Sequence, residues 1–235
     1  MPYGGYGMAG GTFQPIRGLS KWLINLMYVT IAGSVITLFA QILLRDSARD
    51  YINNSLSSSE FTSKAGLYVG VGLLLGVVGI AQTVLLIIWA FRMAKNHLVL
   101  GRLPQSFSAG ATIAVNILGG CTLGILNFFM WTELWKASDP ETAPGDSSWK
   151  QRSSTPLLAI YLAGGLINVV GAIALGLSGF GAIRLNSTST KFAESLNDRL
   201  ALVLLIGAIG VATNVIFLMF VKQISARHMK ATREA

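Results

Sequence analysis

The sequence predicts an all-α integral membrane protein: a helical bundle of four long transmembrane helices plus either a central re-entrant hairpin or a fifth transmembrane helix. Hydrophobic residues make up 52% of the chain and charged residues 12%, which is about half the charged share of soluble domains. The charges are clustered, and long uncharged runs separate the clusters. A bilayer selects such runs because an unpaired charge at its centre costs several kcal/mol.

The net charge of +8 and the single cysteine narrow the possible functions. The 18 Lys and Arg residues lie between the apolar runs, a pattern typical of the positive-inside rule. We therefore expect membrane lipids with anionic headgroups as partners, and no nucleic acid. One cysteine, Cys121, excludes an internal disulfide and a CxxC-type zinc cluster.

The chain is predicted to have three parts. Residues 1–20 are rich in glycine and tyrosine and form a flexible N-terminal tail, because they cannot build a core. Residues 21–222 form the transmembrane bundle. Residues 223–235 form a basic cytoplasmic tail that is suited to lie on anionic headgroups.

The first predicted span covers about residues 22–44, and the second covers about residues 66–91. The first run is longer than the apolar part of a signal peptide and has no clear A-x-A cleavage site after it, so we interpret it as a membrane anchor. In the second span three glycines lie on one helix face, at Gly72, Gly76 and Gly79. Glycine lets a neighbouring helix approach closely, so this face is expected to pack against another helix.

The third long span covers about residues 156–183, and the last covers about residues 200–221. Both carry small residues on one face, which predicts further helix packing at Gly164, Gly171, Gly207 and Gly210. The segments 45–65 and 184–199 are rich in Ser, Thr and Asn. We expect both to be loops on the same, less basic side of the membrane.

The uncharged run 103–132 decides the topology. Residues 107–131 either cross once or break at 116–120 and return. Four spans with a hairpin place twelve Lys and Arg residues on one side and six on the other, whereas five spans give at best ten and eight. The positive-inside rule therefore favours the hairpin, with both termini in the cytoplasm. The five tryptophans fall on the same basic side, and the length of the run is the main argument for a fifth crossing.

The sequence contains no recognisable catalytic constellation. The interiors of the four long spans carry no Asp, Glu, Lys, Arg or His, and no phosphate-binding loop or HExxH motif is present. We therefore expect no enzyme activity, no catalytic residue, no cofactor and no metal site. Glu133 is expected to pair with Arg92 or Lys136. His97 and His228 lie in basic interfacial segments, where each could ligate a haem or chlorophyll axially, although neither lies deep in a span.

Amide side chains form the other polar set in the apolar runs. Each is expected to hydrogen-bond to another helix, and together they are the candidate lining of a small polar cavity. The set comprises Asn25, Gln41, Gln82, Asn116, Asn127, Asn168 and Asn214.

Two motifs indicate a family. The second predicted span ends in an aromatic-rich stretch that continues into Arg-x-x-x-Asn and a Leu/Gly turn, with Arg92 and Asn96. About thirty residues later the chain reads Glu-Leu-Trp-basic-x-Ser-Asp-Pro, with Glu133, Trp135, Ser138, Asp139 and Pro140. Both motifs resemble a bacterial multi-pass membrane family known as domain of unknown function 4328. The resemblance covers about residues 20–220.

The chain departs from that family between the two motifs. The family usually has a Pro-Gly-Trp start and a proline-broken middle, whereas residues 106–110 read SFSAG here and a glycine pair stands at 119–120. The resemblance implies a bacterial inner-membrane location and a multi-pass architecture. It brings no established activity or cofactor.

Two functions follow as expectations. The first is a non-enzymatic accessory or scaffold subunit that packs against other membrane proteins, or against copies of itself, and against anionic lipid. The alternative is a small-solute transporter or channel lined by the buried Asn and Gln side chains.

Overall fold

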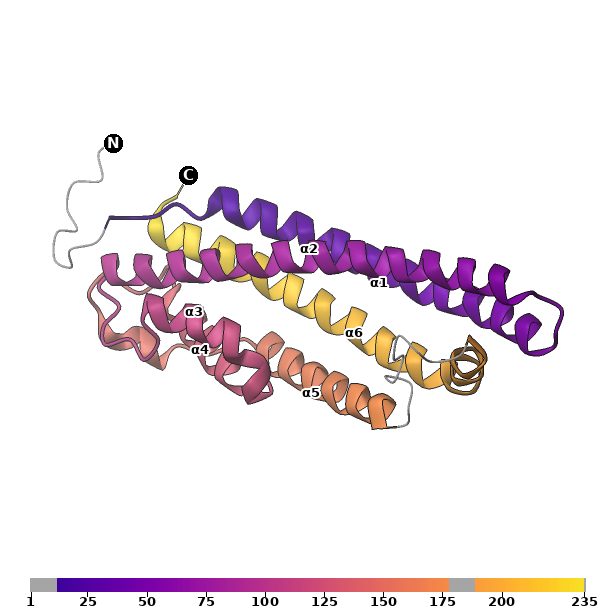
Figure 1. Cartoon of the computed structure of the whole chain (residues 1–235). Coiled ribbons are helices and arrows are strands. Elements are labelled where there is room, and N and C mark those ends of the chain that lie inside the picture. The colour runs from indigo at the N-terminus through magenta and orange to yellow at the C-terminus, as the bar shows by residue number, and fades with distance from the viewer. Residues whose placement is uncertain (1–11, 178–188, 235) are drawn as a thin grey trace. The chain divides into compact units, whose positions relative to one another are not determined.

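A computed structural model describes residues 12–177 and 189–234, which form helices joined by short connections with no strand among them (Figure 1). Residues 1–11 of the predicted flexible tail lie outside the described residues. The elements in chain order are α1 (Arg17–Ile52), α2 (Ser58–Val99), α3 (Ala109–Leu118), the 3-10 helix η1 (Gly119–Thr122), α4 (Ile125–Ala137), the 3-10 helix η2 (Ser147–Gln151), α5 (Pro156–Leu177) and α6 (Ser189–Thr232).

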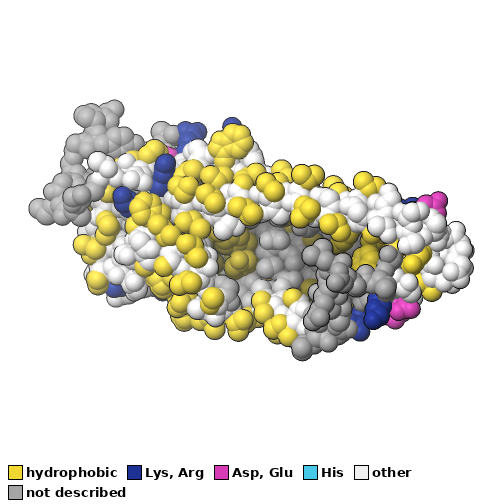
Figure 2. All heavy atoms as spheres, viewed as in Figure 1, with side chains coloured by type: hydrophobic (Ala, Val, Ile, Leu, Met, Phe, Trp, Pro, Cys, Tyr) yellow, Lys and Arg dark blue, Asp and Glu magenta, His cyan; other side chains and the backbone are white. Residues whose placement is uncertain are grey.

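Four of the described helices are long and apolar enough to cross a membrane, which confirms the prediction of an all-helical chain with four such helices. In the most apolar stretch of α2 no residue is buried within the chain. Large hydrophobic side chains are exposed along the long helices (Figure 2). Continuous exposed apolar surface of this kind indicates contact with lipid or with other proteins.

The connections between the long helices are shorter than the sequence predicted. The expected loop 45–65 is largely helical, because α1 continues to Ile52 and α2 begins at Ser58. The prediction of a loop over residues 184–199 is also partly wrong, since α6 begins at Ser189. Polar composition suggested loops, but apolar side chains spaced along these extensions are buried together at Leu44, Ala48, Phe61, Ala193, Leu196 and Leu200.

The uncharged central run folds as two short helices joined by η1. Helix α3 has 10 residues and α4 has 13, so at ~1.5 Å per residue neither reaches the ~30 Å thickness of the hydrocarbon. The first helix ends at Leu118, and Gly124 adopts a positive φ of 79° just before α4 begins. The amide of Asn116 lies 3.7 Å from the sulfur of Met130, so the two helices lie side by side.

The chain divides into two compact units, which we describe separately. Unit 1 comprises residues 1–27, 81–163 and 215–235, and unit 2 comprises residues 28–80 and 164–214. Each of the four long helices contributes to both units. In unit 2 the rings of Tyr51 and Phe61 stack at 4.9 Å, and Gln41 donates a hydrogen bond of 2.7 Å to the hydroxyl of Tyr68.

Four of the glycines predicted to pack helices lie against side chains of unit 2. A Cβ on Gly164 would collide with Thr213, and a Cβ on Gly207 would collide with Leu38. A Cβ on Gly171 would lie 2.8 Å from Ile206, and one on Gly210 would lie 3.2 Å from Asn168.

The glycines of α2 have a different environment. A Cβ built on Gly72, Gly76 or Gly79 has no heavy atom of the described chain within 4 Å. The same is true of Gly66 and Gly70 on this helix. The other described elements of unit 2 therefore leave Gly72 and Gly76 uncovered, and helix packing at this face of α2 stays a prediction.

Aromatic side chains form the core of unit 1. Trp89, Trp131 and Trp149 are fully buried, and the indole of Trp131 contacts Phe217 and Phe220 with ring centroids 5.9 Å apart in both pairs. Trp89 donates a hydrogen bond of 2.9 Å to the hydroxyl of Ser20. These three tryptophans therefore pack inside the protein instead of forming an exposed aromatic belt.

Candidate functional site

Unit 1 contains a dense set of polar side chains, most of them buried, where α2, α4 and α6 end. We call this set the polar cluster. It lies outside the predicted spans 66–91 and 200–221. Its members come from the end of α2, the loop that follows α4 and the end of α6: Asn96, His97, Arg102, Ser138, Asp139, Thr142, Arg152, Arg227 and His228.

The backbone of Gln14 fixes the amide of Asn96. The Asn96 Oδ1 atom accepts a hydrogen bond of 2.8 Å from the Gln14 N–H, and Asn96 Nδ2 donates one of 2.8 Å to the Gln14 carbonyl. The second hydrogen of Nδ2 is then available for Nε2 of His228, at 3.1 Å. Because an amide nitrogen only donates, His228 Nε2 must accept this bond.

The direction of the remaining hydrogen bonds follows from that acceptor. His228 carries its proton on Nδ1 and donates it to Ser138 Oγ, at 3.1 Å. The Ser138 hydroxyl therefore donates its own hydrogen to His97 Nε2, at 3.0 Å. Hydrogen bonds are thus donated from Asn96 to His228, from His228 to Ser138 and from Ser138 to His97. Because Nε2 of each histidine accepts a hydrogen bond, both imidazoles must be neutral.

Burial favours the same protonation state. Both histidines are at most 1% exposed. Burial lowers the pKa of His228 to about 3. The pKa of His97 lies well below 6.5, mainly through burial and then through the nearby His228 and Arg102. The two imidazoles are therefore neutral near pH 7, and this end of the protein depends on their staying so.

Arg102 holds the loop after α4 through its carbonyl groups. Its guanidinium donates hydrogen bonds of 2.6 Å to the carbonyls of Thr142 and Ala143, and longer ones to those of Asp139 and Ala137. The residue is only 1% exposed. A planar guanidinium with five N–H groups can serve four acceptors at once, which a lysine ammonium cannot do.

Asp139 connects the same loop to α6. Its Oδ1 atom accepts from Arg227 Nη2 at 2.6 Å, and its Oδ2 atom lies 2.8 Å from Arg152 Nε. The hydroxyl of Thr142 donates a further hydrogen bond of 2.7 Å to Oδ2. The buried carboxylate is thus paired with two cations, and the Arg227 guanidinium also lies over the ring of Trp135.

The prediction that Glu133 forms an ion pair with Arg92 or Lys136 is wrong. Glu133 accepts hydrogen bonds of 3.0 to 3.1 Å from the backbone N–H groups of Ser106 and Phe107. Arg92 donates to the carbonyl of Pro15, and Lys136 donates to the carbonyl of Lys150. Ser106 and Phe107 lie in the connection just before the N-cap Ser108 of α3, and their N–H groups take the carboxylate as acceptor where a side-chain cation was expected.

The two family motifs come together in unit 1. Asn96, Ser138 and Asp139 join the polar cluster, and Glu133 ties the start of α3 to α4. Trp135 donates to the carbonyl of Ser153, and Pro140 follows Asp139 in the loop.

Sequence reasoning missed the roles of six cluster members, and one of them, Thr142, was not considered at all. Arg102, Arg152 and Arg227 were counted only as charges that mark one side of the membrane, and the histidines were considered only as ligands. The motifs carried one usable signal for the cluster: the motif residue Asn96 stands next to His97 in the sequence, and the motif residues Ser138 and Asp139 stand next to each other. Their partners on α6 lie about ninety or more positions away, so local patterns do not reveal them.

The chemical capacity of the cluster is limited by its burial. A serine hydroxyl that donates to a histidine is the arrangement of an activated nucleophile, but His97, Ser138 and His228 are each at most 1% exposed. Among the described residues no group of three or more His, Cys, Asp or Glu side chains is placed to hold a metal ion. The geometry is that of a closed hydrogen-bond network that joins three helix ends.

Comparison with known proteins gives one family match. A family model described as "Domain of unknown function (DUF4328)" matches residues 53–226. Neither the curated proteins nor the solved structures include a match to this chain.

Proposed function

Because this chain belongs to the family of domain of unknown function 4328, whose name carries no activity, we propose its function from its surface and its buried contacts. It is a non-enzymatic multi-pass protein of the bacterial inner membrane, an accessory or scaffold subunit. Its partners are other membrane proteins, or a second copy of itself, together with anionic lipid.

The observation that carries this proposal is the uncovered glycine face of α2. Glycines elsewhere in the bundle, such as Gly164 and Gly207, have side chains of other helices against them. On α2, Gly72 and Gly76 have open space, while Leu73 and Leu74 beside them are about 70% exposed. In a bilayer, small residues let helix backbones approach, and this close contact replaces the hydrophobic drive that lipid removes.

The polar cluster supports a structural role for this end of the protein, because its side chains bond mostly to other residues of the chain. Arg102 bonds to four carbonyls, and Asp139 is paired with two arginines. A reactive site needs access for its substrate, and Arg102 and Asp139 are buried.

The scaffold proposal predicts that leucine on the glycine face removes a partner without unfolding the chain. Gly72→Leu and Gly76→Leu place side chains in open space, so we expect the thermal midpoint in detergent to change little. After extraction in a mild detergent, native mass and protein identification should show a stoichiometric assembly for the wild type and its loss in the double variant.

The matched control is Ala172→Leu with Ala174→Leu, which adds the same two side chains to exposed positions of α5. This control is expected to retain the assembly. A wild type that is extracted as a bare monomer, or an assembly that survives the α2 substitutions, would contradict the proposal.

We also propose that α3, η1 and α4 form a re-entrant hairpin between four spans, with both termini in the cytoplasm. The lengths of α3 and α4 support it, as does the contact of Glu133, near the end of α4, with the backbone at the start of α3. That contact brings both ends of the hairpin to one level. Re-entrant backbone is tolerated where protein covers it.

This topology predicts that residues before and after the hairpin react on the same side of the membrane. In a Cys121→Ser background, Ser106→Cys and Ser147→Cys each supply one exposed thiol. A membrane-impermeant maleimide should label both from the cytoplasmic face of inverted vesicles and neither from the outside of intact spheroplasts. Labelling from opposite faces would mean that the run crosses the membrane a fifth time.

The second candidate function is a small-solute transporter or channel lined by amide side chains. Two members of the predicted amide set, Gln41 and Asn127, have buried oxygens without a hydrogen-bond partner among the described residues, which favours it. Against it, Asn116 and Asn168 donate to carbonyls of their own helices. Solute flux into vesicles that contain only this protein distinguishes the transporter from the scaffold.

A further inference from the structure

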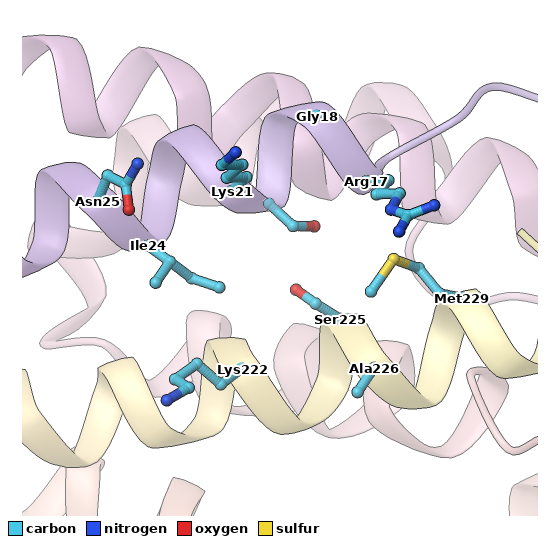
Figure 3. A pocket seen from close by; sticks show the side chains of 10 residues that line it. Arg17, Gly18, Lys21, Ile24, Asn25, Lys222, Ser225, Ala226 and Met229 are labelled. Carbon is cyan, nitrogen blue, oxygen red and sulfur yellow. The ribbon is translucent and has the colours of Figure 1, made fainter. Parts of the chain in front are cut away.

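A groove of about 580 Å³ lies in unit 1 between the start of α1 and the end of α6 (Figure 3). Three of its lining side chains are cationic: Arg17 and Lys21 from α1, and Lys222 from α6. The rest of the lining is mostly apolar and includes Ile24 and Met229. The groove therefore combines a positive rim with an apolar floor.

A buried hydroxyl in this groove lacks a partner. Ser225 is 2% exposed, and its Oγ atom makes no hydrogen bond with any described residue. Figure 3 shows this hydroxyl pointing from α6 into the space between the two helices. A buried polar group without a hydrogen bond is destabilising, so Ser225 indicates that a group from outside the chain binds here.

The carboxylate of Glu234, which lies at the start of α1, forms no ion pair with the side chain of Arg17 or Lys21. Glu234 accepts hydrogen bonds of 3.0 and 2.7 Å from the N–H groups of Ile16 and Arg17, so both of its oxygens cap the start of α1. Within the described part of the chain, the side chains of Arg17 and Lys21 belong to no ion pair. Glu234 therefore already occupies the start of α1, and the binding capacity rests on the side chains.

The groove lies at the expected level of the lipid headgroups. Lys21 immediately precedes the predicted span 22–44, and Lys222 immediately follows the predicted span 200–221. Trp22, which is 65% exposed, is of the type enriched at membrane interfaces. Cations at this level attract anionic headgroups, and the apolar floor suits the glycerol and the first methylenes of a lipid.

We propose that this groove binds the headgroup of an anionic phospholipid. Arg17, Lys21 and Lys222 pair with the phosphodiester charge, and the Ser225 hydroxyl donates a hydrogen bond to a phosphate oxygen. This site goes beyond general attraction of the basic rim to the bilayer. It rests on the membrane location in the proposed function and does not depend on a protein partner.

The test measures lipid binding to the full-length protein in a zwitterionic detergent. Phosphatidylglycerol and phosphatidylcholine are added as mixed micelles, and lipid retention is counted by native mass spectrometry alongside the thermal midpoint. We expect selective retention of phosphatidylglycerol. The triple variant Arg17→Gln, Lys21→Gln and Lys222→Gln should weaken it by at least about tenfold, since each cation near an anionic surface contributes about fivefold.

A second triple variant controls for net charge. Lys95→Gln, Lys150→Gln and Lys230→Gln remove three cations from unit 1 outside the groove, and we expect phosphatidylglycerol affinity within about twofold of the wild type. Ser225→Ala should keep or raise the lipid-free midpoint, because it removes an unpaired buried hydroxyl, while it weakens lipid binding several-fold.

Two results would overturn the proposal. Equal losses in both triple variants would show only general surface charge. Millimolar inorganic phosphate or glycerol phosphate that matches the effect of phosphatidylglycerol would assign the groove to a free anion. If the protein fractionates with membranes and keeps its assembly but does not prefer phosphatidylglycerol, this inference fails while the proposed function stands.

Discussion

Replacing Arg102 with glutamine is expected to lower the free energy of unfolding by about 4 kcal/mol, because four carbonyls lose their donor and those of Ala137, Asp139 and Thr142 belong to buried residues. Glutamine is shorter and has one amide group, so it cannot serve acceptors spread over residues 137–143. Unfolding in detergent, followed by the fluorescence of the buried Trp131 and Trp149, measures the loss.

Two variants make this test specific. Arg102→Lys keeps the charge but lacks the planar fork of donors, so it should recover less than half of the lost stability. Arg49→Gln removes an exposed arginine that donates one hydrogen bond, to Asn197, and should cost less than about 1 kcal/mol. An Arg102→Gln protein as stable as Arg49→Gln would show that the loop does not depend on the guanidinium.

Stability is also expected to fall as the pH is lowered from 7.5 to 5. The pKa of His228 is about 3 in the folded protein and about 6.5 when unfolded, so below pH 6.5 the unfolded chain binds the additional proton. The contribution of the neutral histidine is complete above pH 6.5 and is lost as the pH falls toward 3. At pH 5 the loss for His228 is about 2 kcal/mol, and His97, whose pKa is also lowered, adds in the same direction.

The variant His228→Gln identifies the source of this pH dependence. It should be less stable at pH 7.5, because the bonds to Asn96 and Ser138 are lost, and its unfolding midpoint should change less between pH 7.5 and 5. The carboxyl of Asp146 has a pKa below 3.8 through hydrogen bonds from Ser148, so its titration falls below this window. Parallel pH profiles for the wild type and the variant would refute the assignment.

The four long helices could be predicted because composition and charge spacing are local properties of the sequence. Their true ends could not, since polar residues such as those in 45–65 were interpreted as solvated loops. Leu44, Ala48 and Phe61 within or beside that segment pack against α6 residues far along the chain. Tertiary burial of these few apolar side chains extends the helices past the expected membrane boundary.

The motif residues were found, but their bonding was not. Charge counting treats Arg102 and Arg227 as markers of one side of the membrane, although both make buried or partly buried hydrogen bonds within the protein. Glu133 was expected to form an ion pair with Arg92 or Lys136, but it accepts hydrogen bonds from backbone N–H groups. Pairwise sequence reasoning has no means of ranking a backbone donor above a charged side chain when the tertiary neighbours are unknown.

The order of synthesis gives the hydrogen-bond chain of the polar cluster a consequence for biogenesis. Asn96 and His97 emerge from the ribosome long before His228, which lies 132 positions after Asn96. Until α6 is made, these polar groups have to be hydrated or held by the insertion machinery, because buried unpaired donors are costly. The hydrogen bonds of unit 1 are therefore completed last. A nascent chain that stops before His228 leaves Asn96 and His97 without their partner and is expected to be degraded by membrane proteases.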